Sequence, residues 1–290
     1  MLIKNNMKLI EILKSKRKQI FILIILSIVF CSCDKKEKKQ DNSLGIPDGY
    51  SLVWSDEFDI DGLPDSGKWD YDIEANEAGW YNEELQYYSY GRIENSKVSD
   101  GKLMIIARKE ALTNAGDYGG QEYTSARLIT KGKANWKYGF FEIRAKLPCG
   151  LGTWPAIWLL GDNNIPWPGN GEIDIMEQVG LYPDEITGTV HTRSTEGTSG
   201  DGNLVIINDV CEVFHNYQLT WTPEKITIAV DGTPFHTYIN QGTGTNSWPF
   251  DNPQYLLLNL AIGGEMAGTT IDDNIFPVQM EVEYVRIYQK

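Results

Sequence analysis

Three acidic residues lie close together in an otherwise apolar stretch of the chain. Residues 171–178 read GEIDIMEQ, so Glu172, Asp174 and Glu177 are separated by isoleucine and methionine. In a β-strand successive side chains point to opposite faces, which would put Glu177 on the face opposite to the first two acids. A β-bulge of one extra residue would return Glu177 to their face. The spacing therefore predicts a bulged strand that presents three carboxyl groups on one face, with the isoleucines anchored in the core.

Carboxyl groups arranged in this way suit glycoside hydrolysis. A retaining glycosidase needs an ionised carboxylate as nucleophile and a protonated carboxyl group as general acid, about 5–5.5 Å apart. Glu172 and Glu177 would fill these roles, and Asp174 would hydrogen-bond the nucleophile and help to set the distribution of protons. Two alternatives are an acidic edge strand and a metal site, although a metal site would draw on carbonyl or amide ligands in a loop.

The elements that must position these acids are short strands. Runs such as KLMIIARK at 102–109, QYLLLNLAIGG at 254–264 and MEVEYVRIYQ at 280–289 are separated by clusters of Gly, Asn, Asp and Pro. Asp231-Gly232 is a hairpin signal, and no long stretch after residue 48 has a helical apolar period. We predict one all-β domain, an antiparallel β-sandwich of the jelly-roll, concanavalin-like kind, with a concave substrate cleft.

The N-terminal segment has the pattern of an export signal. Six Lys or Arg and one Glu precede the apolar run at 20–30, which is short for a membrane span and is followed by Ser32-Cys33. This order resembles a bacterial lipoprotein signal, with residues 1–32 removed and Cys33 lipidated. An uncleaved anchor and ordinary cleavage are the alternatives.

A polar tether is expected to follow the signal. Residues 33–47 are mostly charged or polar, which predicts a flexible tether ahead of a catalytic domain at 48–290. We therefore expect an exported lipoprotein at the outer membrane, the cell surface or the periplasmic side. Only the lipid anchor would hold it to the membrane.

The predicted mature chain is strongly acidic. Removing residues 1–32 takes away six of 26 basic and one of 40 acidic residues, which leaves 20 against 39 and a net charge of −19. This balance argues against nucleic acid and anionic polymers as partners, and it suits a neutral polysaccharide as substrate. We expect the protein to be a monomer. Export would permit a disulfide between Cys149 and Cys211, but two free thiols are equally open.

A longer pattern resembles glycoside hydrolase family 16, in its laminarinase-type branch of endo-β-1,3-glucanases. The resemblance covers essentially all of residues 50–289. The segments that carry it are LVWSDEFD, NEELQYYS, SARLITKGKANWKYGFFEIRAKLPCGLGTWPAIWLLG, GEIDIMEQVG, GTVHT, NLAIGG and DDNIFPVQMEVEYVRIYQ. It implies retaining endo-hydrolysis of a laminarin-like β-1,3-glucan by double displacement, without a catalytic cofactor. Glu172 would be the nucleophile, Glu177 the acid/base and Asp174 the assisting acid.

The resemblance also implies residues that bind the sugar chain. Trp154 and Trp158 would share one strand face in the cleft, with core packing as the alternative. Asn82 and Arg127 match positions that hydrogen-bond sugar hydroxyls, although Arg127 could instead form a surface ion pair. His191 would bind near the acid/base, or serve as a structural hydrogen-bonder. Weaker candidates for the cleft rim are Trp136, Trp167 and Trp248.

Two features leave details of the resemblance open. Residues 263–268, GGEMAG, lack a tryptophan that is common in that loop of the family, so the linkage is uncertain. The alternatives are a related enzyme acting on mixed-linkage β-1,3-1,4-glucan or agarose, and a non-catalytic lectin-like domain. One structural Ca²⁺ is a further expectation, with Glu57, Gly101 and Glu283 as candidate ligands, although Glu283 stands where Asp is commoner.

Overall fold

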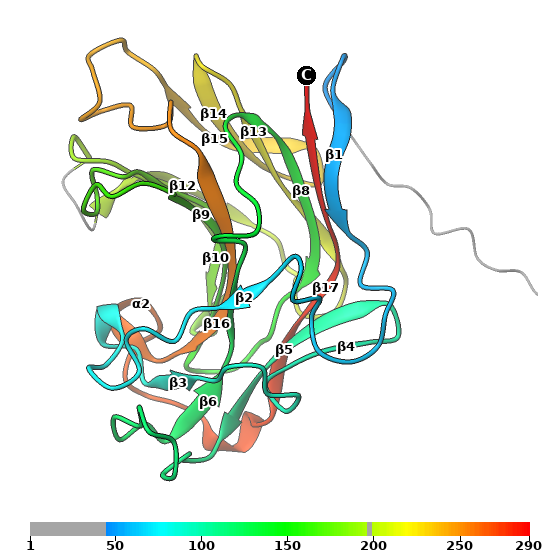
Figure 1. Cartoon of the computed structure of the whole chain (residues 1–290), viewed down its shortest axis with the longest axis vertical. Helices are drawn as coiled ribbons and strands as arrows, with labels where there is room; N and C mark the ends of the chain where they lie inside the picture. Colours follow the sequence, from blue (N-terminus) through cyan, green and yellow to red (C-terminus); the bar gives the residue numbers. More distant parts are fainter. Residues whose placement is uncertain (1–44, 196–198) are drawn as a thin grey trace, which may run out of the picture. The chain divides into compact units, whose positions relative to one another are not determined.

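The computed structural model describes residues 45–195 and 199–290, and these form one sandwich of two β-sheets (Figure 1). The predicted signal peptide, Cys33 and the tether up to residue 44 lie outside the described residues. The predicted all-β jelly-roll class is confirmed. Within residues 45–195 and 199–290, no helix is long and apolar enough to cross a membrane.

The larger sheet, here called the outer sheet, is antiparallel except where its short strands β3 and β6 run parallel. Its order is β15 (Thr233–Ile239), β14 (Lys225–Val230), β13 (His215–Trp221), β8 (Gly139–Lys146), β17 (Val278–Gln289), β5 (Lys102–Lys109), β6 (Tyr123–Ser125) and β3 (Gln86–Tyr88), while β1 (Ser51–Asp56) also pairs with β17 and β4 (Ser96–Ser99) with β5.

The inner sheet is wholly antiparallel and carries the three acids on its strand β10. Its order is β12 (Asp201–Ile206), β11 (Tyr182–His191), β10 (Glu172–Val179), β9 (Thr153–Gly161), β16 (Gln254–Ile262), β7 (Arg127–Ile129) and β2 (Asp70–Tyr71). Short helical turns are η1 (Tyr81–Glu83), α2 (Gly264–Ala267) and η3 (Asp273–Ile275).

The core lies between the two sheets and follows the two-residue period of each strand. On β16, Leu256, Leu258 and Leu260 belong to this core, while Leu257 and Tyr255 form a separate cluster on the opposite face. Since β16 is covered on both faces, its sequence reads as a continuous apolar run. Side chains on the face away from the core are therefore free to build a cleft.

A disulfide joins Cys149, just after β8, to Cys211, just before β13, with their Cα atoms 5.7 Å apart. The bond closes a separation of 62 residues. We expect the Cys149→Ala/Cys211→Ala variant to lose about 4 kcal/mol of unfolding free energy, the loop-entropy estimate for this length. Urea unfolding under oxidising conditions would measure it. A reducing agent should lower the wild-type midpoint and leave the variant unchanged; an unaffected wild-type midpoint would contradict the bond.

Candidate active site

The predicted bulge is present in β10. Asp174 and Glu177 lie opposite Thr189 and Thr187 of β11, so three steps on β10 match two steps on β11. Toward β9 the register shifts between Asp174 and Met176. The intervening isoleucines and Met176 are fully buried in the core. The extra residue therefore turns all three acids toward the same face.

The three acids line a cleft of about 510 Å³ on the face of the inner sheet that points away from the core. Strands β2, β7, β9, β10 and β16 contribute to its walls, as does the turn η1. Four predicted substrate-binding residues also line it: Asn82, Arg127, Trp154 and Trp158. The fold thus gathers into one cleft residues that are far apart in sequence.

Glu172 lies among groups that partly offset its burial. The indole Nε1 of Trp167 donates a hydrogen bond to its Oε2 over 3.0 Å. Burial raises the pKa of Glu172, and the charge of Asp174 raises it further. The positive charges of His191 and Arg127 act in the opposite direction. Glu172 therefore has nearby groups that stabilise its ionised form.

Glu177 is also buried among like charges. Burial raises its pKa, and the charges of Asp174 and Glu172 add to the effect. It accepts one hydrogen bond, from Nε1 of Trp154 over 3.0 Å. Repulsion between the two glutamates acts on both of them, so the cluster retains a shared proton, and the positive charge of Arg127, which lowers the pKa of Glu172, favours that proton on Glu177. The arrangement supports an ionised Glu172 and a protonated Glu177.

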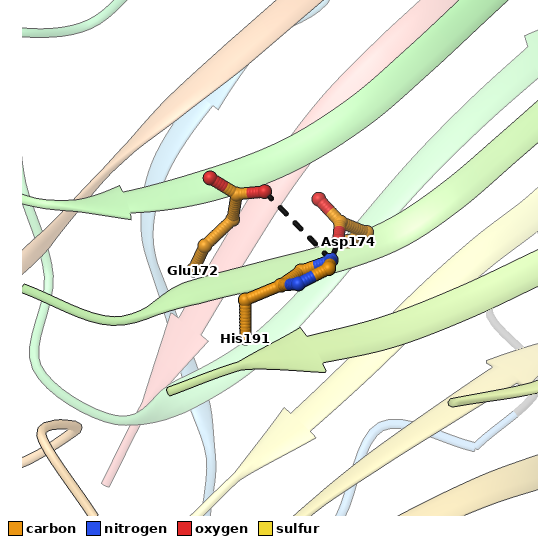
Figure 2. A group of neighbouring side chains, drawn as sticks. All are labelled: Glu172, Asp174 and His191. Carbon is orange, nitrogen blue, oxygen red and sulfur yellow. Dashed lines mark ion pairs between the residues drawn. The ribbon is translucent and has the colours of Figure 1, made fainter. Parts of the chain in front are cut away.

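His191 lies beside Glu172 and Asp174 (Figure 2). It is opposite Glu172 in the register of β10 and β11, and its Nε2 is 3.1 Å from Oδ2 of Asp174 and 4.0 Å from Oε1 of Glu172. Its charge also lowers the pKa of Glu177, so His191 acts on all three acids, and its expected contact with the acid/base region stays a prediction. Three ligand atoms of this group lie within 4.8 Å of one another, but their residues stand on two paired strands, β10 and β11, rather than in a ligand-rich loop.

Arg127 is stacked rather than free in the cleft. Its guanidinium carbon lies 4.6 Å from the ring centroid of Trp158 and 5.1 Å from that of Trp80. Its Nε is 3.2 Å from Oδ2 of Asp72, and both side chains are largely buried. Arg127 therefore does form an ion pair, as the alternative interpretation proposed, but the pair with Asp72 lies in the wall of the cleft and not on the open surface.

Trp158 is oriented by a chain of hydrogen bonds that the sequence did not reveal. Its Nε1 donates to Oδ1 of Asn259 over 2.7 Å, and Nδ2 of Asn259 donates to the hydroxyl of Tyr88 over 3.1 Å. That hydroxyl lies 3.4 Å from Oε2 of Glu84, whose pKa is raised by burial. The one available signal was a polar Asn within the apolar run QYLLLNLAI.

The other candidate residues divide between the cleft and the core. Asn82 lies in η1 with φ of 57°, is exposed and lines the cleft. Trp167, which had weaker support, lines the cleft beside Glu172. Trp136 and Trp248 are buried in the main core, so their placement on the rim is wrong.

The two glutamates predicted as calcium ligands each pair with an arginine. Both carboxylate oxygens of Glu57 accept from Arg286 over 3.0 Å, and Oε2 of Glu283 accepts from Nε of Arg144 over 2.7 Å. Gly101 lies in the turn between β4 and β5. Arginines thus pair with both glutamate side chains, and the calcium site stays a prediction.

We expect Trp154→Phe to move the alkaline limb of the pH–kcat/KM profile to higher pH. The indole bond stabilises the ionised form of Glu177, so its loss should raise the pKa of Glu177 by up to about 1 unit. Deprotonation of Glu177, which would end activity if this residue is the general acid, would then need a higher pH. Trp158→Phe is the control, because its indole bonds Asn259 instead. An unmoved or lowered limb would contradict this assignment.

Comparisons with known proteins agree on one family. The model of the glycosyl hydrolases family 16 matches residues 83–286. The beta-glucanase of Rhodothermus marinus is 44% identical over 300 residues, which cover 98% of this chain and 98% of that protein. A solved structure of a non-specific endo-β-1,3(4)-glucanase from the same family is 50% identical, with a TM-score of 0.82, and the match covers 85% of this chain and 93% of that one. The laminarinase structure from Rhodothermus marinus is 47% identical, with a TM-score of 0.78, and the match covers 83% and 97%.

Proposed function

The chain belongs to glycoside hydrolase family 16, and from this premise we propose that it is a retaining endo-glycosidase that hydrolyses β-1,3-glucan. The observation that carries the proposal is the bulged strand β10, which turns Glu172, Asp174 and Glu177 into one cleft. A glucan-binding lectin would need no set of buried carboxyl groups whose pKa values are raised.

The mechanism uses two displacements at the anomeric carbon. The carboxylate of Glu172 attacks that carbon while Glu177 transfers its proton to the departing glycosidic oxygen, so a glycosyl ester on Glu172 forms as the glycosidic bond breaks. Glu177, now ionised, takes a proton from water, and the resulting hydroxide attacks the same carbon and releases Glu172. Two inversions give net retention. Apart from the sugar and one water molecule, each group that reacts is a side chain of the protein, and no cofactor takes part.

Asp174 and His191 would control the nucleophile rather than react. Asp174 lies between the two glutamates in sequence, raises the pKa of both and contacts His191 over 3.1 Å. A charge at Asp174 therefore favours retention of one proton by the cluster, and His191 offsets that charge beside Glu172. This division keeps the nucleophile ionised while the acid stays protonated.

The charge of the cleft favours a neutral polysaccharide. Its walls carry six carboxyl groups and two basic groups: Asp72, Glu74, Glu84, Glu172, Asp174 and Glu177 against Arg127 and Lys131. A sulfated chain such as carrageenan would meet net repulsion at close range. Stacking surfaces and hydrogen-bonding side chains remain for glucose rings.

Mixed-linkage β-1,3-1,4-glucan is the second candidate substrate. The similarity to a solved non-specific endo-β-1,3(4)-glucanase at 50% identity favours it. Agarose has no such support. Loop 263–268, whose α2 helix lies beside the cleft, presents exposed Glu265 and Met266 and carries no aromatic residue.

From the sequence signal alone, we also propose export as a lipoprotein with Cys33 as the lipidated residue. The catalytic domain would then act as a monomer at the membrane surface on a polysaccharide outside the cytoplasm. Mass spectrometry of the N-terminal peptide from the membrane fraction would test this: a diacylated Cys33 supports it, and an unmodified residue at that position contradicts it.

The test of function is the release of reducing sugar from laminarin, lichenan, agarose and carrageenan by the protein from residue 48. We expect cleavage of laminarin, weaker cleavage of lichenan and no cleavage of carrageenan. Cleavage of agarose alone would be consistent with the proposed mechanism and would contradict β-1,3-glucan as the substrate. Glucan binding without any cleavage would favour the lectin-like alternative.

A further inference from the structure

One aromatic side chain of the cleft has no role in the mechanism above. Tyr81 lines the cleft from η1, and 76% of the residue is exposed to solvent. Within residues 45–195 and 199–290, its hydroxyl forms no hydrogen bond and its ring stacks on no other aromatic ring. A large aromatic side chain left in solvent at the edge of a binding cleft is more typical of ligand binding than of packing.

The three cleft tryptophans are, by contrast, each held by a hydrogen bond. The indole of Trp154 donates to Glu177, that of Trp158 to Asn259 and that of Trp167 to Glu172. Trp158 also has the guanidinium of Arg127 stacked against it. These contacts fix the rings, whereas the ring of Tyr81 is uncommitted in the absence of a ligand.

The backbone around Tyr81 is held in an unfavourable conformation. Asn82 and Glu83, the next two residues, both have φ of 57°, in the left-handed region that non-glycine residues rarely adopt. Such strain persists where the surrounding structure imposes it, and it often marks ligand-binding sites. It is a reason to look for a function in this turn.

Both ends of the turn are anchored, so Tyr81 stands on a firm base. Trp80 is buried, and its Nε1 donates to Oδ1 of Asn76 over 2.9 Å. On the other side the backbone of Glu84 bridges to Gly263, and the N–H of Leu85 donates to the carbonyl of Ile262. The backbone that carries this ring is thus fixed before a ligand binds, so binding has to order only the side chain.

We propose that Tyr81 is a substrate-binding residue that stacks on a pyranose ring of the bound glucan at the edge of the cleft. The phenol ring would cover the apolar face of the sugar, and its free hydroxyl would bond a sugar hydroxyl. Its neighbour Asn82 lines the same cleft, so both residues would act on one stretch of the chain. This inference rests on the proposed function and adds a binding contact to it.

The contact would be made equally in the ground state and the transition state, because Tyr81 takes no part in either displacement. Losing it should therefore raise KM and leave kcat almost unchanged. We expect Tyr81→Ala to raise KM for laminarin about tenfold, with kcat within about twofold of wild type, the size of one aromatic stacking contact. Tyr81→Phe should keep most of the affinity.

The control is Tyr90→Ala, because Tyr90 is 65% exposed and does not line the cleft. It should leave KM and kcat unchanged, and thermal unfolding should show all three variants folded like the wild type. An unchanged KM in Tyr81→Ala would overturn the proposal. The proposal would also be overturned if kcat fell by the same factor as KM rose and the melting temperature were lower, because that result would indicate a structural role.

Binding measured without turnover separates this inference from the proposed function. In a Glu172→Gln background, Tyr81→Ala should weaken the Kd for laminarin by the same factor as it raises KM. If the wild type cleaves laminarin and Tyr81→Ala changes neither KM nor Kd, only the stacking role fails. If the wild type cleaves no β-1,3-glucan, the proposed function fails, and an unaltered Kd would then reject the stacking role separately.

Discussion

Glu172→Ser should lower kcat on laminarin by more than about 10⁴-fold while the protein remains folded. Without this carboxylate no glycosyl ester can form, and the remaining groups cannot supply an equivalent nucleophile. The loss is measured as reducing-sugar release, and the fold is checked by thermal unfolding. Residual activity within about tenfold of wild type would show that another residue attacks the sugar.

Azide should partly restore turnover in Glu172→Ser, and its product reports the role of the missing residue. The smaller serine leaves room for azide on the face that Glu172 occupies, so one displacement gives the α-glycosyl azide. If Glu172 were instead the acid/base, azide would intercept a glycosyl-enzyme and give the β-glycosyl azide. The anomeric configuration, read by NMR, therefore distinguishes the two assignments.

Glu177→Gln should lower kcat on laminarin by roughly 10²- to 10⁴-fold, the usual contribution of general acid–base catalysis. The defect should be smaller for an aryl glycoside, because a good leaving group needs no proton. Release of the aryl group followed by slow hydrolysis should appear as a burst, since deprotonation of water also depends on Glu177. Equal defects on both substrates would contradict the acid/base role.

The same substitution should stabilise the folded protein above about pH 5. The folded pKa of Glu177 is raised above its ordinary value of 4.5 by burial and by two neighbouring acids. Its contribution to stability is therefore fully present below pH 4.5 and is lost as the pH rises through the folded pKa. Glutamine removes this loss, and we expect a gain of about 1–2 kcal/mol near neutral pH.

Thermal unfolding of wild type and Glu177→Gln across pH 4–9 measures the effect. The difference should be small at pH 4, increase with pH and become constant above the folded pKa. Glu212→Gln, which changes an exposed glutamate outside the cleft, is the control and should show no such trend. A variant that is less stable than wild type at neutral pH would contradict the electrostatic account of the site.

Local patterns were enough to predict the strand that carries the acids. The apolar residues between Glu172 and Glu177 require core positions. Because the third acid has an odd spacing, all three acids can lie on one face only if the strand has a bulge. The two-residue period likewise predicts that Trp154 and Trp158 share a face, and both line the cleft. These features depend on residues that are close together in the sequence, so they can be predicted from the sequence alone.

Contacts between distant segments could not be read in the same way. The position of Trp167 beside Glu172 depends on the path of the loop between β9 and β10, and the stacking of Arg127 between Trp80 and Trp158 joins three segments. Trp136 sits in the core because its loop bridges to Gln254 at the start of β16. No periodicity in the sequence encodes such pairings, and the sequence alone does not distinguish a tryptophan in a core from one in a cleft.

Covalent trapping tests the central claim most directly. The protein would be incubated with a β-linked glucosyl donor that carries 2-deoxy-2-fluoro substitution and a good leaving group, which slows the second displacement more than the first. Peptide mass spectrometry would then locate the added sugar. We expect it as an ester on Glu172, within the peptide that contains residues 171–178. An adduct on Glu177, or complete turnover of the donor by Glu172→Ser without any adduct, would contradict Glu172 as the nucleophile.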